Sequence, residues 1–593
     1  MSDLCFWKCG QRLALLFTLL NCLSTGTALA GDLIACPNPP LPSVDPGSEI
    51  CSVESGSADL LLVGDVLTPG TVYLGGTVLL GVTGTIDCVG CDCAAASPAA
   101  TRVICPDAVI SPGLINAHDH VGWMHHAPWT SAETGVDPDL RFEHRHDWRV
   151  GTRSHPNLNA GPGNASVAER TFGELRFVLG GATSFFGSGN AGGLLRDLDS
   201  PGVDGLGLQG ADYDTFPLGD ADGTLRSTTC DYPDPVDALP LDADAYVGHV
   251  AEGIDSEARN EFLCLTGGRP DAVDVLDDGT ALIHGAGLRA EDVQTMAERG
   301  ISLVWSPRSN LAIYGETAPV TVMDILGVPI GLGTDWIRSG SMNVLRELAC
   351  ADEFNTFHLG GYFSDEDLWR MATLGSAEAL GVDDAIGLLA PGFGGDVAVF
   401  AKDGRDAYGA VVGADVGDVA LVLRGGQVLS GNSTVVAALE ASCDDIGDVC
   451  GNDKRVCLAG TAVMTWPMLL SEIGTPAYPA FSCGVPDDEP SCIPMRTLAA
   501  DVVLGSNLYD GMPTVQDPDG DGLDQFDDNC PDVFNPIRPV DGGVQGDSDF
   551  DGIGDACDTT PVPEPRGHLL LLVGLAILAP LLRASPSTAD RRH

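Results

Sequence analysis

Two histidines, His118 and His120, stand two residues apart at the end of the apolar run that begins at Ile110. On a β-strand this spacing puts both side chains on the same face. Two neutral imidazoles that converge at a strand end are suitable ligands for zinc or iron. Alone, such a pair is more often a surface or core feature, so the rest of the chain must supply the support.

Four further polar residues follow apolar runs in the same way. His249 ends one run and Glu252 comes three residues later, while His284 and Asp335 end two more. A helical pattern with a glycine stop, 290–300, lies between two of these runs. Strand and helix in alternation, with a polar residue at the C-terminal end of each strand, is typical of a (β/α) barrel.

This ordered set resembles the amidohydrolase superfamily, and within it the cytosine deaminase and chlorohydrolase branch. The resemblance covers residues 58–430 and includes the segment Ser306–Asn310. It implies an α/β fold, with a (β/α)8 TIM barrel at 110–390 and a small β-sandwich built from the chain ends, at 58–109 and 391–435. It also implies one divalent metal, zinc or iron, with ligands His118, His120, His249 and Asp335, and the catalytic residues Glu252, His284 and Asp335.

The resemblance implies hydrolysis of a small molecule. A metal of this kind lowers the pKa of bound water towards roughly 7. Asp335 would take a proton from the water, Glu252 would pass one to a ring nitrogen or leaving group, and His284 would polarise the reacting centre. We expect attack on an sp² carbon and cleavage of a non-peptide carbon–nitrogen bond, as in a deaminase. The alternatives are a cyclic amide hydrolase of the imidazolonepropionase kind and a surface-anchored binding protein with an inactive barrel.

The lysine content favours one metal over two. Relatives with two metals typically bridge them with a carboxylated lysine, but no lysine lies between Lys8 and Lys402. A pair bridged by glutamate or cysteine stays open, with Cys230 and Cys264 as conceivable ligands.

Aromatic and basic residues near the predicted strand ends are candidates for the substrate pocket, and a guanidinium there would suit a substrate carboxylate. The four that we predict are Trp129, Arg308, Trp336 and Arg338. A second group either lines the pocket or forms a polar, partly buried loop: Trp123, His125, His126, His144, Arg145, His146, Trp148 and Arg149. Residues 190–245 predict a middle strand near 205–209 and a loop over the barrel mouth.

Composition and the N-terminus indicate an exported protein. The net charge of −54 argues against nucleic-acid binding. Residues 1–30 have the basic start, apolar run and small-residue cleavage site of a signal peptide, which predicts a periplasmic, cell-surface or extracellular location. Outside this segment an even number of cysteines remains, which predicts disulfides. For Cys88, Cys91 and Cys93, metal binding is the weaker alternative.

The C-terminal quarter of the chain has three predicted parts. Residues 440–510 form an extension that contains cysteines and has no usable motif. Residues 517–558 resemble the thrombospondin type 3 repeat, which implies a calcium-binding acidic stalk, with a plain acidic linker as the alternative. An EF-hand is excluded because its glutamate at the twelfth loop position is missing. The predicted calcium ligands are Asp517, Asp519, Asp521, Asp524, Asp528, Asp547, Asp549, Asp551 and Asp555.

Residues 562–593 resemble a PEP-CTERM-type sorting signal, with Pro563-Glu-Pro565 followed by an apolar run. The resemblance implies association with a membrane or the cell surface, although the tail is longer than usual and the apolar run is short for a bilayer span. A core helix is the alternative. No sequence feature indicates an oligomeric state.

Overall fold

The computed structural model describes residues 32–37, 50–187, 192–200, 202, 205–240, 243–462, 464–498 and 506–563. The predicted signal peptide lies outside the described residues, as does all but the first two residues of the predicted sorting segment. Within the described part of the chain, no helix is both long enough and apolar enough to cross a bilayer.

Eight strands among the described residues form the barrel, in two parallel sheets that join at both edges. The Ala211 amide donates to the Leu198 carbonyl (2.8 Å) at one join, and a parallel bridge between Asp119 and Asp335 forms the other. The predicted TIM barrel is therefore confirmed. Its strands are β7 (Leu114–Asp119), β8 (Ala182–Gly187), β9 (Arg196–Asp197), β10 (Asp212–Asp214), β11 (Tyr246–Val250), β12 (Thr280–His284), β13 (Ser302–Trp305) and β14 (Ile330–Leu332).

The second join is held by side chains as well as by backbone. The Asn116 amide donates to the Thr334 hydroxyl (2.6 Å), which in turn donates to Asp119 (2.6 Å). A Cβ at Gly333 would lie 2.8 Å from the backbone nitrogen of His118, so only glycine permits this approach of β14 to β7. Asp335 is thereby brought next to the two histidines of the first strand.

The helices around the barrel are unevenly distributed. Between β8 and β11 the described residues contain no helix, and a long loop occupies 215–240. The strand predicted near 205–209 is wrong, because Gly205 and Gly207 turn the chain there with positive φ, and β9 and β10 flank the turn. The barrel helices are α2 (Ser131–Thr134), α3 (Arg145–Val150), α4 (Val167–Leu179), α5 (Ser256–Leu265), α6 (Ala290–Arg299), α7 (Pro307–Tyr314), α8 (Val320–Leu326), α9 (Val344–His358), α10 (Asp365–Met371) and α11 (Leu374–Ala379).

Strands from both ends of the chain meet beside the barrel in one 11-stranded sheet. β6 (Ala100–Pro112) pairs antiparallel with β15 (Val397–Ala401), so the chain enters and leaves the barrel side by side. The remaining strands are β1 (Asp32–Ala35), β2 (Ser52–Glu54), β3 (Ser57–Thr68), β4 (Thr71–Leu80), β5 (Ile86–Gly90), β16 (Val419–Arg424), β17 (Gln427–Asn432), β18 (Asp444–Val449) and β19 (Asn452–Val456).

This sheet extends further along the chain than the predicted bounds of 391–435. β17 pairs with β19, and the disulfide Cys443–Cys457 joins the segments that flank the last two strands. The arrangement of these strands as a sandwich stays a prediction. The helices of this part are α12 (Gly409–Val412), α13 (Ser433–Leu439), α14 (Leu458–Thr461) and α15 (Trp466–Ile473). Short 3₁₀ helices among the described residues are 93–95, 121–123, 152–154, 416–418 and 539–541.

All sixteen cysteines beyond residue 30 form disulfides, as predicted. Cys230 pairs with Cys264, so neither thiol can bridge a second metal. The alternative of metal binding at Cys88, Cys91 and Cys93 is likewise excluded by pairing. The bonds are 36–91, 51–105, 88–93, 230–264, 350–492, 443–457, 450–483 and 530–557.

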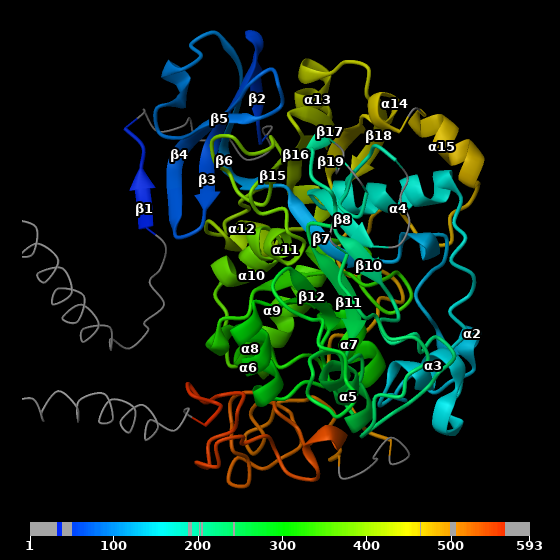
Figure 1. Cartoon of the computed structure of the whole chain (residues 1–593). Coiled ribbons are helices and arrows are strands. Elements are labelled where there is room, and N and C mark those ends of the chain that lie inside the picture. Colours follow the sequence, from blue (N-terminus) through cyan, green and yellow to red (C-terminus); the bar gives the residue numbers. More distant parts are fainter. Residues whose placement is uncertain are drawn as a thin grey trace, which may run out of the picture.

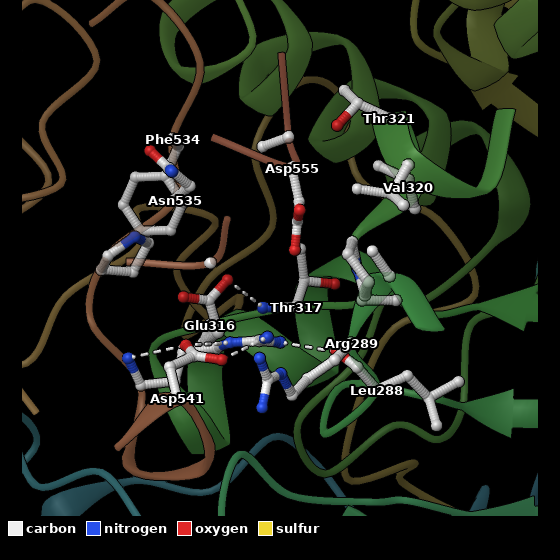
Figure 2. A pocket seen from close by; sticks show the side chains of 18 of the residues that line it. Leu288, Arg289, Glu316, Thr317, Val320, Thr321, Phe534, Asn535, Asp541 and Asp555 are labelled. Atoms are coloured by element: carbon white, nitrogen blue, oxygen red, sulfur yellow. Dashed lines mark hydrogen bonds and ion pairs between the residues drawn. The ribbon is translucent and has the colours of Figure 1, made fainter. Parts of the chain in front are cut away.

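Residues 506–563, the acidic segment, pack against the barrel instead of projecting from it as a stalk (Figure 1). Phe534 is buried, and the Arg538 guanidinium donates to the carbonyls of Ala286 (3.0 Å) and Leu288 (3.1 Å) in the loop after β12. A cavity of about 60 Å³ remains between the segment and these loops (Figure 2). The stalk prediction is wrong because a few apolar and basic residues anchor an otherwise acidic chain.

Candidate metal centre

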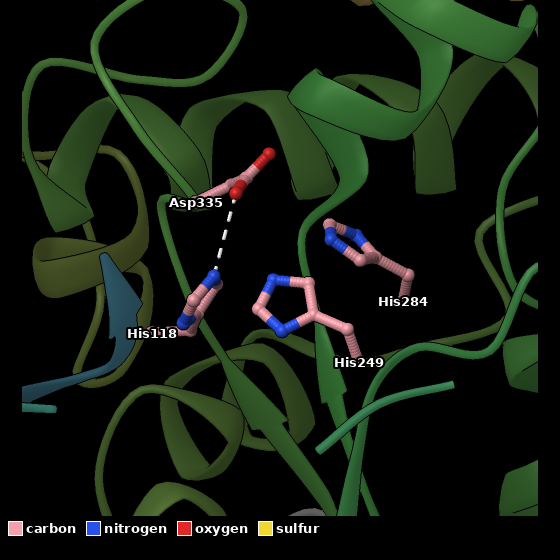
Figure 3. A group of neighbouring side chains, drawn as sticks. All are labelled: His118, His249, His284 and Asp335. Atoms are coloured by element: carbon pink, nitrogen blue, oxygen red, sulfur yellow. Dashed lines mark ion pairs between the residues drawn. The ribbon is translucent and has the colours of Figure 1, made fainter. Parts of the chain in front are cut away.

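Four side chains converge at the carboxyl end of the barrel (Figure 3). His118 lies in β7, His249 in β11, His284 at the end of β12 and Asp335 just after β14. One potential ligand atom from each lies within 4.8 Å of the others, and all four side chains are buried. Parallel strands deliver these residues to one edge although they span more than 200 positions of sequence.

Two of these residues have left-handed backbone conformations. φ is +75° at His284 and +62° at Asp335. Non-glycine residues seldom adopt such values, which cost roughly 1–3 kcal/mol and concentrate at functional sites. The strands therefore end in turns that direct these two side chains towards the centre of the barrel.

The four predicted metal ligands lie close together, and His284 lies beside them. Asp335 Oδ1 is 3.4 Å from His118 Nε2 and 3.6 Å from His120 Nε2. The His249 ring centroid is 4.8 Å from that of His118 and 5.3 Å from that of His284. His284, predicted only as a catalytic residue, is thus as close to the cluster as the predicted ligands are.

The electrostatics of the cluster suit a cation. Burial lowers the pKa of His120 to about 3 and holds the pKa values of His118 and His249 well below the usual range, with help from neighbouring imidazoles. Both ring nitrogens of His118 and Nδ1 of His249 are buried without a hydrogen bond. Buried polar atoms are normally paired, so these neutral imidazoles fit a divalent metal that would take their lone pairs.

Helix α7 supplies three side chains that hold the polar groups of the cluster. The Ser309 hydroxyl donates to Asp335 Oδ2, Asn310 Oδ1 lies 2.9 Å from His284 Nδ1, and the Tyr314 hydroxyl donates to Glu252 Oε1 (2.7 Å). The motif at 306–310 indicated a polar turn without assigning these roles. Tyr314 carries no sequence signal, because only the helix after β13 brings it to a residue that follows β11.

Glu252 lies at the edge of the cluster. Its Oε2 is 3.8 Å from His284 Nε2, while its other oxygen accepts from Tyr314. Because Asn310 Oδ1 can only accept, His284 Nδ1 donates to it, and Nε2 on the other side of the ring faces Glu252. Two of the predicted catalytic side chains, Glu252 and His284, are therefore oriented towards each other.

A cavity of about 600 Å³ opens onto the cluster. Of the four predicted pocket residues, only Trp336 lines it, and Trp129 packs behind Trp336 with ring centroids 5.0 Å apart. Tryptophans and arginines from the loop after β7 form much of its wall. The lining side chains include His120, Trp123, Arg145, Trp148, Arg149, Arg170, Thr215, Phe216, His249, Glu252, His284, Asp335 and Trp336.

Arg308 and Arg338 are not pocket residues, which corrects the prediction. Arg308 is directed away from the site, donating to Ser341 (2.6 Å) and pairing with Glu489 (3.2 Å). Arg338 pairs with Glu133 and lies over the Trp129 ring. Both guanidiniums stabilise the fold, because their donors are already bound by carboxylates and carbonyls of other segments.

The loop after β7 both lines the pocket and forms a polar, buried network, which are the two alternatives that its sequence left open. Trp123, Arg145, Trp148 and Arg149 line the cavity. His125, His126, His144 and His146 do not. His144 Nε2 is 3.3 Å from Glu261, and His146 Nε2 is 2.8 Å from Asp220, inside a buried network that also fixes Arg145.

The similarity to known proteins includes the part of the chain that carries most of the cluster. Residues 245–429 match the sequence model of the amidohydrolase family. An 8-oxoguanine deaminase from Pseudomonas aeruginosa is 34% identical over 159 residues, 26% of this chain and 35% of that protein. A guanine deaminase from Rattus norvegicus is 33% identical over 124 residues, 20% of this chain and 27% of that protein.

A 5-methylthioadenosine/S-adenosylhomocysteine deaminase from Pyrococcus abyssi is 32% identical over 165 residues, 26% of this chain and 38% of that protein. The chain thus spans between 27% and 38% of the length of these three curated relatives. Among solved structures, a zinc-bound adenosine deaminase from Xanthomonas campestris is 18% identical with a TM-score of 0.45, covering 63% of this chain and 93% of that one. The residues that match the amidohydrolase family model include His249, Glu252, His284 and Asp335.

Proposed function

We propose that this protein is a metal-dependent hydrolase that cleaves non-peptide carbon–nitrogen bonds in small molecules, with the chemistry of a deaminase. The observation that carries the proposal is the buried cluster of three histidines and Asp335 at the mouth of a sizeable cavity. The similarity of this region to deaminases supports it. Imidazole and carboxylate ligands favour zinc or iron.

When bound, the metal would activate water and polarise the substrate. Asp335 accepts a proton from the attacking water, because Ser309 already occupies Oδ2 and leaves Oδ1 facing the histidines. The water oxygen adds to the sp² carbon, and the carbon–nitrogen bond breaks. Glu252, held by Tyr314, gives a proton to the ring nitrogen of the substrate and takes one back from the added hydroxyl. The proton taken up by Asp335 is returned to the departing nitrogen, which leaves as ammonia or an amine.

The cavity wall favours a planar substrate that carries a negative charge. Trp123, Trp148, Trp336 and Phe216 offer aromatic surface around the cluster. Arg149 donates to the Ala221 carbonyl (2.6 Å), and its Nε is buried without a partner. A guanidinium with an unused donor in a ligand cavity suits a carboxylate or phosphate group on the substrate.

The test begins with elemental analysis of the purified protein and a screen for ammonia release from heteroaromatic amines, with and without a carboxylate. We expect one zinc or iron per chain and release of ammonia. Arg149→Gln should selectively weaken turnover of the charged substrates, whereas Arg226→Gln, at a loop arginine paired with Asp231, should not. Hydrolysis without ammonia would instead indicate a cyclic amide substrate, and a folded protein that binds no metal would overturn the proposal.

Further proposals concern the ends of the chain. We propose that calcium binds the acidic segment at two groups of aspartates, 517–521 and 547–551, in each of which three carboxylates lie together. Hard oxygen ligands of this kind suit calcium. We also propose export to the periplasm, cell surface or medium, supported by the disulfides, with attachment through the C-terminal segment. Proteinase treatment of intact cells tests the location.

A further inference from the structure

The C-terminal extension, residues 440–510, contacts α7 at both ends of the helix. At the N-terminal end, Arg308 donates to the Pro490 carbonyl (2.5 Å) and pairs with Glu489. At the C-terminal end, Arg496 donates to the Tyr314 carbonyl (3.1 Å) and Tyr509 donates to the Gly315 carbonyl (3.2 Å). The last carbonyls of a helix lack partners within the helix, so these donors satisfy groups that would otherwise be buried and unpaired.

Arg496 is the centre of this contact. It is fully buried, pairs with Glu143 (2.7 Å) and also donates to the Phe142 carbonyl (3.3 Å). Its backbone forms an antiparallel bridge with Tyr509. One side chain therefore joins the extension, the end of α7 and the loop after β7 that leads to the cavity.

The same helix carries the side chains that orient the cluster, Ser309, Asn310 and Tyr314. The shortest connection runs from Arg496 through the backbone of Tyr314 to its hydroxyl, and from there to Glu252. A displacement of α7 by a fraction of an ångström would lengthen this hydrogen bond. Misplacement on this scale is costly for proton transfer, because catalysis depends on pre-set geometry.

We propose that Arg496 is a positioning residue for the hydrolytic site, acting through α7 and Tyr314 on Glu252, so that the C-terminal extension is a working part of the active site. The proposal rests on the proposed function for its kinetic readout. Its structural readout depends only on the hydrogen bonds described above and needs no enzymatic activity.

The test compares Arg496→Lys with Arg176→Lys in the full chain. Arg176 is a matched control, because it is equally buried and donates to two carbonyls of the same extension, at Tyr478 (2.9 Å) and Pro479 (2.8 Å), but from α4. Lysine keeps a cation beside Glu143 and cannot reach all of the partners of Arg496. We expect kcat to fall on the order of tenfold in Arg496→Lys with KM and metal content unchanged, and to stay near wild type in Arg176→Lys.

A double-mutant cycle then tests the route. Tyr314→Phe should lower kcat by a similar factor, and Arg496→Lys combined with Tyr314→Phe should be little worse than either change alone, because both remove the same interaction. Multiplied losses would overturn the proposed route, and equal losses in Arg496→Lys and Arg176→Lys would show only general damage.

Hydrogen exchange of the α7 amides gives a readout that needs no turnover. Exchange should rise in Arg496→Lys and not in Arg176→Lys. Faster exchange in a chain without any hydrolase activity would contradict the proposed function while supporting the structural link. Unchanged exchange in Arg496→Lys would overturn the link itself.

Discussion

Among the groups of metal-ligating side chains in the described residues, the barrel cluster and the aspartate groups of the acidic segment are built in opposite ways. In the barrel, three imidazoles and a carboxylate come from separate strands. In the acidic segment, Asp517, Asp519 and Asp521 come from five consecutive residues. The rigid barrel positions its ligands through strands far apart in the sequence, whereas the local loop relies on a short chain with glycine turns.

The charges of the two regions differ as well. Burial lowers the pKa values of His118, His120 and His249, so these three rings stay neutral without a metal. Burial and neighbouring carboxylates raise the pKa of Asp519, and they raise that of Asp521 to about 7. The barrel site is thus stable before it is loaded, while the acidic loop stores repulsion that a cation would relieve. The first arrangement suits catalysis and the second suits a structural ion.

The largest expected effect comes from the barrel ligands. Asp335→Asn and His249→Ala should each remove the zinc or iron and lower kcat by about a thousandfold or more, since metal and general base are lost together. Asp324→Asn, at an exposed carboxylate on α8, is the control. Elemental analysis and turnover check the result. Full metal content in both variants would mean that these side chains are not the ligands.

A smaller effect is expected from calcium in the acidic segment. Calcium added to protein prepared without it should raise the unfolding temperature and protect 506–563 from protease, with about 3 kcal/mol of stabilisation at a hundredfold excess over Kd. Asp519→Asn with Asp521→Asn should remove the part of the response that comes from the 517–521 site, whereas Asp532→Asn, an exposed aspartate of the same segment, should keep the full response. An equal response in all three proteins would place the calcium elsewhere.

The smallest effect is a difference in pH dependence between the metal-free regions. The pKa of folded Asp521 is raised to about 7, so its folded state binds the proton more tightly and local stability should fall as pH rises from about 4 to 7. The pKa of folded His120 is lowered to about 3, so stability near the barrel site should fall as pH drops from about 6.5 towards 3. Hydrogen exchange at several pH values measures the local stability of both regions. If stability changed with pH in the same direction in both, the predicted contrast would be contradicted.

The sequence was sufficient to predict which residues meet in the barrel cluster, and insufficient to predict the side chains that support them. His118, His249, His284 and Asp335 each end an apolar run, and parallel strands bring such ends together whatever lies between them. Arg308 misled because it stands beside Ser309 and Asn310 in sequence, but successive residues on a helix point about 100° apart. Its neighbours face the cluster while it faces the extension.

The acidic segment was misplaced for a related reason. Its composition indicates a solvated chain, and its position depends on a few residues. Arg538 reaches a loop 252 positions earlier, and Phe534 packs against Phe354 of α9. No local pattern records such contacts. The same holds for Arg496, whose partners Glu143 and Tyr314 lie far upstream.

The disulfide between Cys350 and Cys492 has a consequence for the order of assembly. It joins α9 to the extension across 142 positions of sequence. The last barrel ligand, Asp335, is made well before Cys492 and Arg496, and domains begin to fold while the chain is still growing. A nascent chain can therefore close its barrel early, yet it acquires the support of α7 only when its C-terminal part arrives and this bond can form. Activity should then mark a finished molecule rather than a folded barrel.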